Sequence, residues 1–212
     1  MTRLRELLLN TMFPVACLSC GAWHQWMCPA HLDQAIPASV VIEGFDGVLS
    51  TGSYADPDLQ HLVTQLKFSG YRECARLLGI RMATQLRHQL RLCDLQHTIL
   101  VPLPLSRWRL NQRGFNQSAL LARTIGQELG LQVEEHALTR SHRRAQSNLA
   151  HRYRAQNSQN VFSLRSSGGF ASKTLILVDD VVTTGSTLRS CAEAIRASVK
   201  PARLFAVVAA HG

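Results

Sequence analysis

The stretch Leu175-Ile-Leu-Val-Asp-Asp-Val-Val-Thr-Thr-Gly-Ser-Thr187 decides the fold class of this chain. Its aliphatic residues predict a buried strand over 174–178, and the small residues that follow predict the start of a helix over 185–199. Backbone N–H groups at a helix start, together with the helix dipole, favour a bound phosphate. Asp179 and Asp180, at the carboxyl end of the strand, can accept hydrogen bonds from a vicinal diol or reach a magnesium ion. The pattern therefore predicts a site for a ribose 5-phosphate; the alternative is a strand and a helix with an aspartate N-cap and no ligand.

Predicted strands and helices alternate along the rest of the chain. Short apolar runs bounded by proline or glycine are typical of inner strands, and apolar residues spaced three and four apart are typical of helices. Such alternation indicates an α/β domain built on a parallel sheet. Residues 102–114 and 139–170 are expected to be loops, the second with a short strand near 161–164. The expected strands cover 45–54, 98–101, 174–178 and 204–209, and the expected helices cover 58–68, 72–90, 115–129 and 185–199.

The composition narrows the class of protein. The chain has 212 residues, 46% of them hydrophobic and 17% charged, which excludes a disordered or coiled-coil protein. No stretch reaches the roughly 18 apolar residues that a membrane span needs. Residues 1–12 are expected to form an amphipathic helix rather than a signal peptide, so we expect no membrane insertion and a cytoplasmic location.

The charge of the chain is strongly basic. The net charge is +9, and residues 96–170 alone carry a net +7. Of the 23 basic residues 20 are Arg, whose guanidinium group grips phosphate with two hydrogen bonds. We therefore expect a polyanionic partner, such as a nucleic acid or a sugar pyrophosphate; the alternative is a solvated basic face that keeps the protein in solution.

Three of the six cysteines lie close together near the N-terminus. Cys17, Cys20 and Cys28 precede His31 in a C-x2-C-x7-C-x2-H pattern, whose two i, i+3 pairs can surround a zinc ion. Four protein ligands would make the site structural, and the metal would fold a segment too small for its own core. His24 is a weaker candidate for the fourth ligand, and the alternative is a set of small buried cysteines without metal.

The strand-end stretch resembles a known signature. The run from Leu175 to Thr187 is similar, at every position, to the phosphoribosyl pyrophosphate (PRPP) signature of type I phosphoribosyltransferases. That resemblance implies that Asp179 and Asp180 are the catalytic acids that bind the ribose hydroxyls, and that Mg2+ accompanies PRPP. The 5-phosphate would bind the turn after the strand, at Thr183, Thr184, Gly185, Ser186 and Thr187.

A second resemblance covers nearly the whole chain, from about Cys17 to Ala209. The segment Val101–Gln117, with its Arg-Gly-Phe-Asn-Gln run, and the triplet Leu66–Phe68 resemble the ComF family of competence proteins. Two positions depart from the family pattern. His31 stands where a cysteine is more usual, which zinc tolerates, and Ala145 stands where a hydroxyl residue is more often found.

The ComF resemblance implies a fold and a division of the chain. The fold would be a type I phosphoribosyltransferase-like parallel sheet flanked by helices, with a small N-terminal zinc-binding finger. Residues 1–42 would form the N-terminal helix and finger, and residues 43–212 the phosphoribosyltransferase-like domain. The loop that contains Arg113 and Gly114 would hold the pyrophosphate of PRPP.

The same resemblance implies a role in DNA uptake, natural transformation or DNA utilisation. Single-stranded DNA and DNA-processing proteins would then be partners. Two alternatives are an active PRPP-dependent phosphoribosyltransferase of nucleotide metabolism and a sensor of the sugar pyrophosphate without turnover. The basic loop over 139–157 can close over a pyrophosphate or follow the backbone of a DNA strand. In the second case its DNA contacts are Arg143, Arg144, Arg152 and Arg154.

Overall fold

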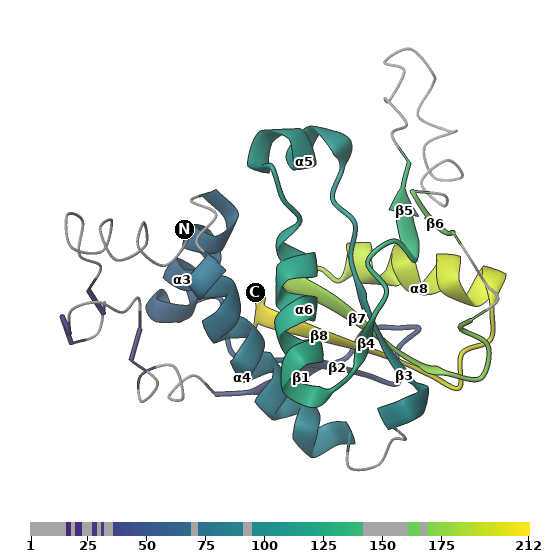
Figure 1. Cartoon of the computed structure of the whole chain (residues 1–212), viewed down its shortest axis with the longest axis horizontal. Helices are drawn as coiled ribbons and strands as arrows, with labels where there is room; N and C mark the ends of the chain where they lie inside the picture. Colours follow the sequence, from purple (N-terminus) through teal and green to yellow (C-terminus); the bar gives the residue numbers. More distant parts are fainter. Residues whose placement is uncertain are drawn as a thin grey trace.

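A six-stranded sheet in the order β1-β2-β8-β7-β3-β4 forms the centre of the protein (Figure 1). The computed structural model describes residues 16–17, 20–22, 27–28, 31, 36–68, 72–90, 95–141, 161–165 and 169–212. Neighbouring strands of the sheet are parallel, except that β1 runs antiparallel to β2, and β5 and β6 form a separate antiparallel pair. The strands are β1 (Ala38–Val40), β2 (Gly47–Ser50), β3 (Thr98–Pro102), β4 (Gln132–Val133), β5 (Leu138–Arg140), β6 (Phe162–Leu164), β7 (Thr174–Val182) and β8 (Arg203–His211).

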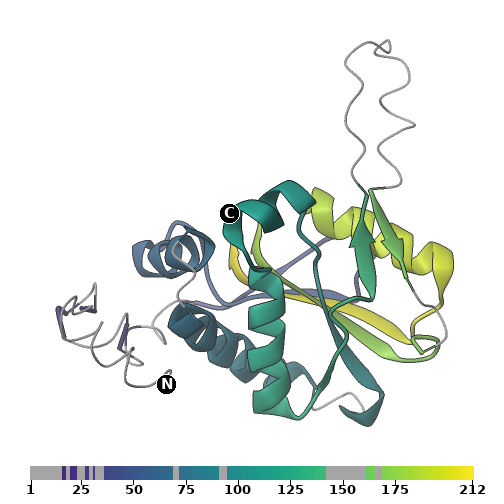
Figure 2. The ribbon, with the colours of Figure 1, turned by 45° about the horizontal axis from the view of Figure 1, so that its top comes forward.

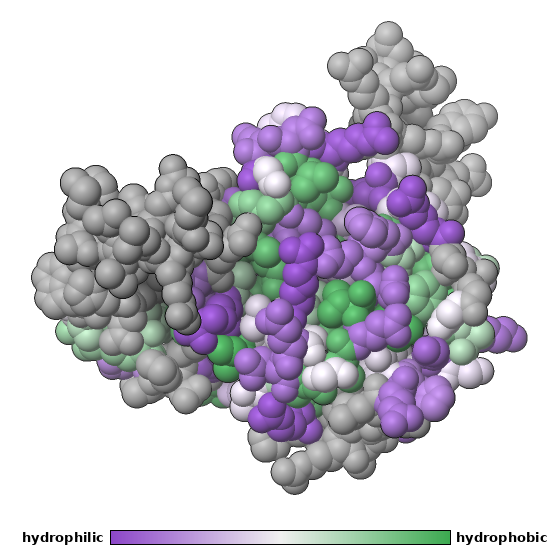
Figure 3. All heavy atoms as spheres, in the orientation of Figure 1, coloured by the Kyte–Doolittle hydropathy of each residue, from purple (hydrophilic) through white to green (hydrophobic). Residues whose placement is uncertain are grey.

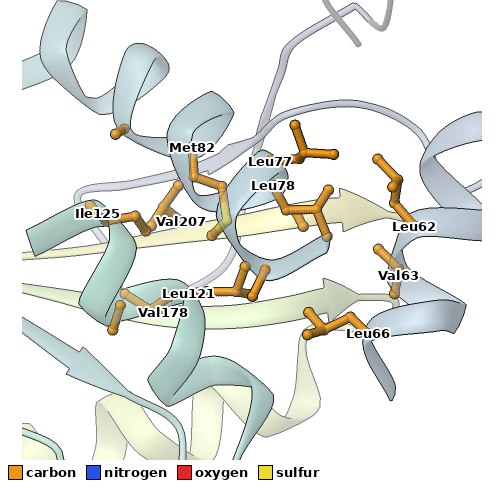
Figure 4. Packing of buried hydrophobic residues seen from close by; sticks show 14 of the residues in the cluster. Leu62, Val63, Leu66, Leu77, Leu78, Met82, Leu121, Ile125, Val178 and Val207 are labelled. Atoms are coloured by element: carbon orange, nitrogen blue, oxygen red, sulfur yellow. The ribbon is translucent and has the colours of Figure 1, made fainter. Parts of the chain in front are cut away.

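Helices cover both faces of the sheet (Figures 1 and 2). They are α3 (Pro57–Phe68), α4 (Arg72–Leu90), α5 (Arg107–Arg113), α6 (Gln117–Leu129) and α8 (Ser186–Ser198), with a 3-10 turn over Leu95–His97. On one face α3, α4 and α6 bury a cluster in which Leu78 and Leu121 meet Val178 and Val207 of the sheet (Figure 4). On the other face α8 and the β5–β6 pair bury a second cluster. The central strands are therefore apolar on both sides, as inner parallel strands are.

The carboxyl ends of β3, β7 and β8 meet at one edge of the sheet, because these strands are parallel neighbours. The chain leaves this edge from β3 into α5 and from β7 into α8, and it reaches its C-terminus there after β8. Ligands of open α/β sheets bind at such an edge. Within the described ranges, no helix is long and apolar enough to cross a membrane.

The α/β class with a largely parallel sheet, expected from the alternation of elements, is confirmed. The helices expected over 58–68 and 72–90 correspond to α3 and α4, and that expected over 115–129 corresponds to α6. The strand expected over 174–178 is longer, because the backbone of β7 keeps pairing with β8 as far as Val182. β1 also belongs to the sheet, although its residues were expected to lie in the N-terminal segment.

The loop expected over 102–114 contains a helix, α5, that the sequence analysis missed. The Ser106 hydroxyl accepts a hydrogen bond from the Arg109 N–H at its start. Gly114, at φ +76°, ends it with a left-handed turn and donates its N–H to the Leu110 carbonyl. No residue of α5 is buried, so these caps rather than a packed face define the helix.

Candidate functional site

The chain between β7 and α8 turns around a small hollow of about 40 Å³, which we call the β7–α8 pocket. Gly185 makes the turn at φ +72°, and a Cβ there would lie 3.0 Å from Cδ1 of Ile42, so glycine is required. α8 begins directly afterwards, at Ser186. The first N–H groups of a helix have no partner within it and carry partial positive charge, which favours an anion. The pocket is lined by Asp179, Val181, Val182, Thr183, Thr184, Gly185, Ser186, Thr187 and Leu188. The structure thus brings together all the residues predicted to hold the 5-phosphate.

Asp179 is the acid that lines this pocket. Its carboxylate accepts hydrogen bonds from the Ser118 hydroxyl and from the Asp180 N–H, each at 2.9 Å. Burial first of all, and the neighbouring Asp180 carboxylate next, raise the pKa of Asp179 to about 7, although these two hydrogen bonds lower it. A carboxyl group that exchanges its proton near neutral pH is suited both to accept hydrogen bonds from a ligand and to move a proton.

Asp180 is buried, at 5% exposure, and faces the other way. Its Oδ1 accepts the Val181 N–H at 2.8 Å. Its Oδ2 accepts a hydrogen bond from Nε2 of Gln117 at 3.2 Å and lies 3.3 Å from Nζ of Lys67. Gln117 and Ser118 are the first residues of α6, so both acids lie at the positive end of that helix. Lys67 belongs to the Leu66–Phe68 triplet that resembles the ComF family, but no pattern in the sequence predicted these contacts.

Arg113 and Gly114, predicted to hold the pyrophosphate, end α5 and are not among the residues that line the pocket. Arg113 is half-buried and Gly114 is exposed. The chain leads from them to Asn116, whose side-chain amide donates to the Leu103 carbonyl and whose own oxygen caps α6. These two bonds fix the start of α6, which carries the partners of the two acids, to the chain directly after β3.

Cys17, Cys20, Cys28 and His31 form a cluster that could hold a metal ion, because their ligand atoms all lie within 4.8 Å of one another. Sγ of Cys17 is 3.5 Å from Nδ1 of His31, and the sulfurs of Cys20 and Cys28 are 3.4 Å apart. Four ligands in a tetrahedron around zinc are separated by about 3.5–3.8 Å, given the usual zinc bond lengths. Gly21, at φ +69°, makes the tight turn after the second ligand. The spacing and the donor set thus suit a closed four-ligand site.

The proposed DNA contacts Arg143, Arg144, Arg152 and Arg154 lie outside the described residues. The same holds for most of the 139–157 loop and for His24, the weaker candidate for a metal ligand. The basic helix α5 is described, and it carries Arg107 and Arg109 on either side of Trp108. Trp108 is 67% exposed, which is unusual for so large a side chain.

Known proteins resemble this chain over most of its length. No protein-family model matches it. It is 34% identical over 159 residues to competence protein F of Haemophilus influenzae, a match that covers 72% of this chain and 67% of that protein. The chain belongs to the ComF family. Another relative, the DNA utilization protein YhgH of Escherichia coli, is 36% identical over 148 residues, covering 69% of this chain and 64% of YhgH.

The part of this ComF-family chain that aligns thus spans about two thirds of the length of each of these relatives. Among solved structures, a purine phosphoribosyltransferase from Pyrococcus horikoshii is similar with a TM-score of 0.34 and 15% sequence identity. That similarity covers 62% of this chain and 82% of the transferase.

The raised pKa of Asp179 predicts a pH dependence for the stability of this ComF-family protein. The ordinary pKa of the group is 3.8, and that in the folded protein is about 7. Between these values the folded state holds a proton that the unfolded state has released, so the free energy of unfolding should fall as pH rises through this window. Asp179→Asn should remove the part of this fall in the free energy of unfolding that is due to Asp179.

The measurement is urea unfolding of both proteins at about pH 4.5 and about pH 8, on either side of most of the transition. We expect Asp179→Asn to gain stability relative to the natural chain at the higher pH. If the free energy of unfolding changes equally with pH in the two proteins, the pKa of Asp179 is not raised in the folded state.

Proposed function

We propose that this chain binds PRPP in the β7–α8 pocket. The observation that carries the proposal is the arrangement of Asp179 and the hydroxyl-rich turn 183–187 around one hollow at the start of α8. The helix start and the hydroxyl groups would hold the 5-phosphate, and the Asp179 carboxylate would accept hydrogen bonds from the ribose diol. The loop end at Arg113 and Gly114 would approach the pyrophosphate when the ligand is bound. The match of the turn to the PRPP signature supports this assignment over a generic phosphate site.

The protein would use this site in DNA uptake or DNA utilisation, in the cytoplasm. The relatives named for competence and for DNA utilization support that role. Single-stranded DNA would bind directly to the protein, and DNA-processing proteins would bind to the resulting protein–DNA complex. The net charge of +9, carried mostly by Arg, supports a polyanionic partner.

Among the described residues, α5 is the element best suited to contact single-stranded DNA. It contains Arg107, Arg109 and Arg113, has no acidic residue and exposes Trp108. In Figure 3 hydrophilic side chains follow the outer edge of α5, with hydrophobic ones directly beneath it. Arginine can neutralise the phosphates while an exposed aromatic ring stacks on a base. Arg143, Arg144, Arg152 and Arg154 would add further contacts to DNA phosphates.

Two metals belong to the proposal. Zinc would occupy the Cys17–His31 cluster, because three thiolates and one imidazole in a closed tetrahedral set are typical zinc ligands. Its role would be structural. Mg2+ would arrive with PRPP and neutralise its pyrophosphate, as hard cations prefer phosphate and carboxylate oxygens.

An active phosphoribosyltransferase is the second candidate. The pKa of Asp179, raised to about 7, favours it, because a pure binding site has no need of a group that exchanges a proton near neutral pH. In that reaction a nucleobase nitrogen would form a bond to the anomeric carbon as the bond to pyrophosphate breaks. A screen of nucleobases with a pyrophosphate readout decides between the two: release with any base establishes the transferase, and release with none establishes the binding protein.

The first prediction of the proposal concerns the phosphate. The double variant Ser186→Ala/Thr187→Val removes two hydroxyl donors from the pocket. Since hydrogen bonds to charged groups contribute about 1.5–3 kcal/mol each, loss of two of them should lower the affinity for magnesium-PRPP by about a hundredfold or more. Isothermal titration calorimetry measures it. Ser198→Ala, at the other end of α8, is the control and should bind as the natural chain does. Equal affinity in the double variant would refute the phosphate assignment.

Metal analysis tests the zinc site. We expect one zinc ion per purified chain, and we expect Cys17→Ala to lose it together with much of the thermal stability. Cys191→Ala is the matched control, because it also removes a buried thiol, but one in α8 that belongs to the other hydrophobic cluster. It should keep its zinc. A purified chain that folds without zinc would exclude a structural zinc role.

DNA binding tests α5. Trp108→Ala should weaken binding of a single-stranded oligonucleotide by about five- to hundredfold, the usual value of one stacked base, and Leu110→Ala on the same helix should change it little. Arg109→Ala should lower the slope of affinity against salt by about one, whereas Arg203→Ala, at the opposite sheet edge, should not. Fluorescence anisotropy measures both. Binding that Trp108→Ala leaves intact would remove α5 from the interface.

The loop needs its own variant. Replacing Arg143, Arg144 and Arg152 together by Ala should weaken DNA binding and flatten its salt dependence in the same assay. If the affinity for the oligonucleotide does not change, the loop does not contact the DNA.

A further inference from the structure

The two neighbouring acids at the end of β7 have different surroundings. Adjacent residues of a β-strand point to opposite faces. Ile176 and Val178 pack into the core beneath α4 and α6, and Asp180 continues this series on the same face. Asp179 lines the β7–α8 pocket, whereas Asp180 is not among its lining residues. Only Asp179 is placed to meet a ligand in that pocket.

The carboxylate of Asp180 is already used within the protein. One oxygen accepts the Val181 N–H at 2.8 Å, and the other lies within 3.3 Å of both Nε2 of Gln117 and Nζ of Lys67. A carboxylate has about four acceptor positions, and three of them are occupied. A buried carboxylate needs such partners to remain charged, and with them it has little capacity left for a ligand.

Lys67 is the counter-charge of this acid. It lies in the last turn of α3, its side chain is 20% exposed, and its Nζ is 5.9 Å from the centre of the Tyr54 ring. The ammonium group therefore lies between an aromatic face and a carboxylate, both of which attract a cation. The ion pair joins α3 to the end of β7, and it balances one of the two negative charges beside the pocket.

Gln117 donates a hydrogen bond to the same carboxylate. It is 3% exposed, and within the described residues its Oε1 has no hydrogen-bond partner, while its Nε2 donates to Asp180. Leaving a buried acceptor unpaired is unfavourable, so an apolar residue would be the better choice if packing were its purpose. Its amide thus serves to hold Asp180, and Ser118 next to it holds Asp179.

We propose that the two acids have different roles. Asp179 accepts hydrogen bonds from the ribose diol, whereas Asp180, held by Lys67 and Gln117, is a positioning residue. The triad of Lys67, Asp180 and Gln117 fixes the end of β7 against α3 and the first turn of α6, which keeps the Asp179 carboxylate aimed into the pocket. The proposal rests on the proposed PRPP site and assigns different roles to two residues that the signature treats alike.

Calorimetry with magnesium-PRPP tests the division through rescue. Asp179→Asn should lower the affinity by about tenfold or more, and adding Lys67→Gln should not restore it. Asp180→Asn and Lys67→Gln should each lower the affinity, because each leaves a buried group unpaired. The double variant Lys67→Gln/Asp180→Asn replaces the ion pair by two amides and should recover most of that loss. If it binds as weakly as Asp179→Asn, Asp180 is a ligand residue and the proposal is wrong.

Thermal unfolding without ligand separates this proposal from the proposed function. Asp180→Asn should lower the melting temperature by about 4 °C or more when Lys67 is present and by much less in the Lys67→Gln background. Asp179→Asn should have the same effect in both backgrounds. Absence of coupling between Lys67 and Asp180 would overturn the triad. If the natural chain fails to bind PRPP but shows the coupling, the proposed function falls and the positioning role of Asp180 stands.

Discussion

Two adjacent carboxylates at the end of a buried strand are the constraint around which this protein is built. Placing a carboxylate at the end of a buried strand is unfavourable unless it finds hydrogen-bond or charge partners. The start of α6 supplies the hydroxyl of Ser118 and the amide of Gln117, and α3 supplies Lys67. These contacts join two helices to the end of β7. The fold thereby keeps negative charge at a place where a turn of hydroxyl residues and a helix start would otherwise attract only anions.

The topology explains why these groups meet. β7 lies between β3 and β8 in the parallel sheet, so the segments that follow all three strands leave from one edge. α8 contributes the turn that lines the pocket, and the chain after β3 contributes α5 and then the first residues of α6. A basic helix with an exposed Trp108 thus follows a neighbouring strand of the same edge. The proposed sites for PRPP and for single-stranded DNA therefore both lie after the carboxyl ends of neighbouring strands.

The sequence was sufficient for the elements that local pattern determines. The buried run before Asp179, the turn at Gly185 and the amphipathic helices all follow from spacing and residue type. It was insufficient for α5, although Ser106 and Gly114 are good caps, because the prolines before it suggested a loop. The contact of Lys67 with Asp180 could not be predicted at all, since it joins residues far apart in sequence through packing of α3 on the sheet.

The cluster of Cys17, Cys20, Cys28 and His31, which could hold a metal ion, is another feature that local pattern predicted. The spacing of its cysteines and His31 predicted ligand atoms close together, and the structure brings them within 4.8 Å. The opposite orientations of the two acids follow from the length of β7, which pairing with β8 extends through Asp179 and Asp180, although aspartate does not favour a strand. The pattern therefore predicted residues that line the β7–α8 pocket, and tertiary pairing determines which of the two acids lines it.

A crystal structure of the chain with PRPP and magnesium is the most direct test of this site. We expect the 5-phosphate to lie against the backbone amides at the start of α8, with the ribose hydroxyls on Asp179 and with Asp180 still paired with Lys67. A structure in which PRPP binds elsewhere, or in which protein side chains fill the pocket in its presence, would contradict the site proposed for this ComF-family protein.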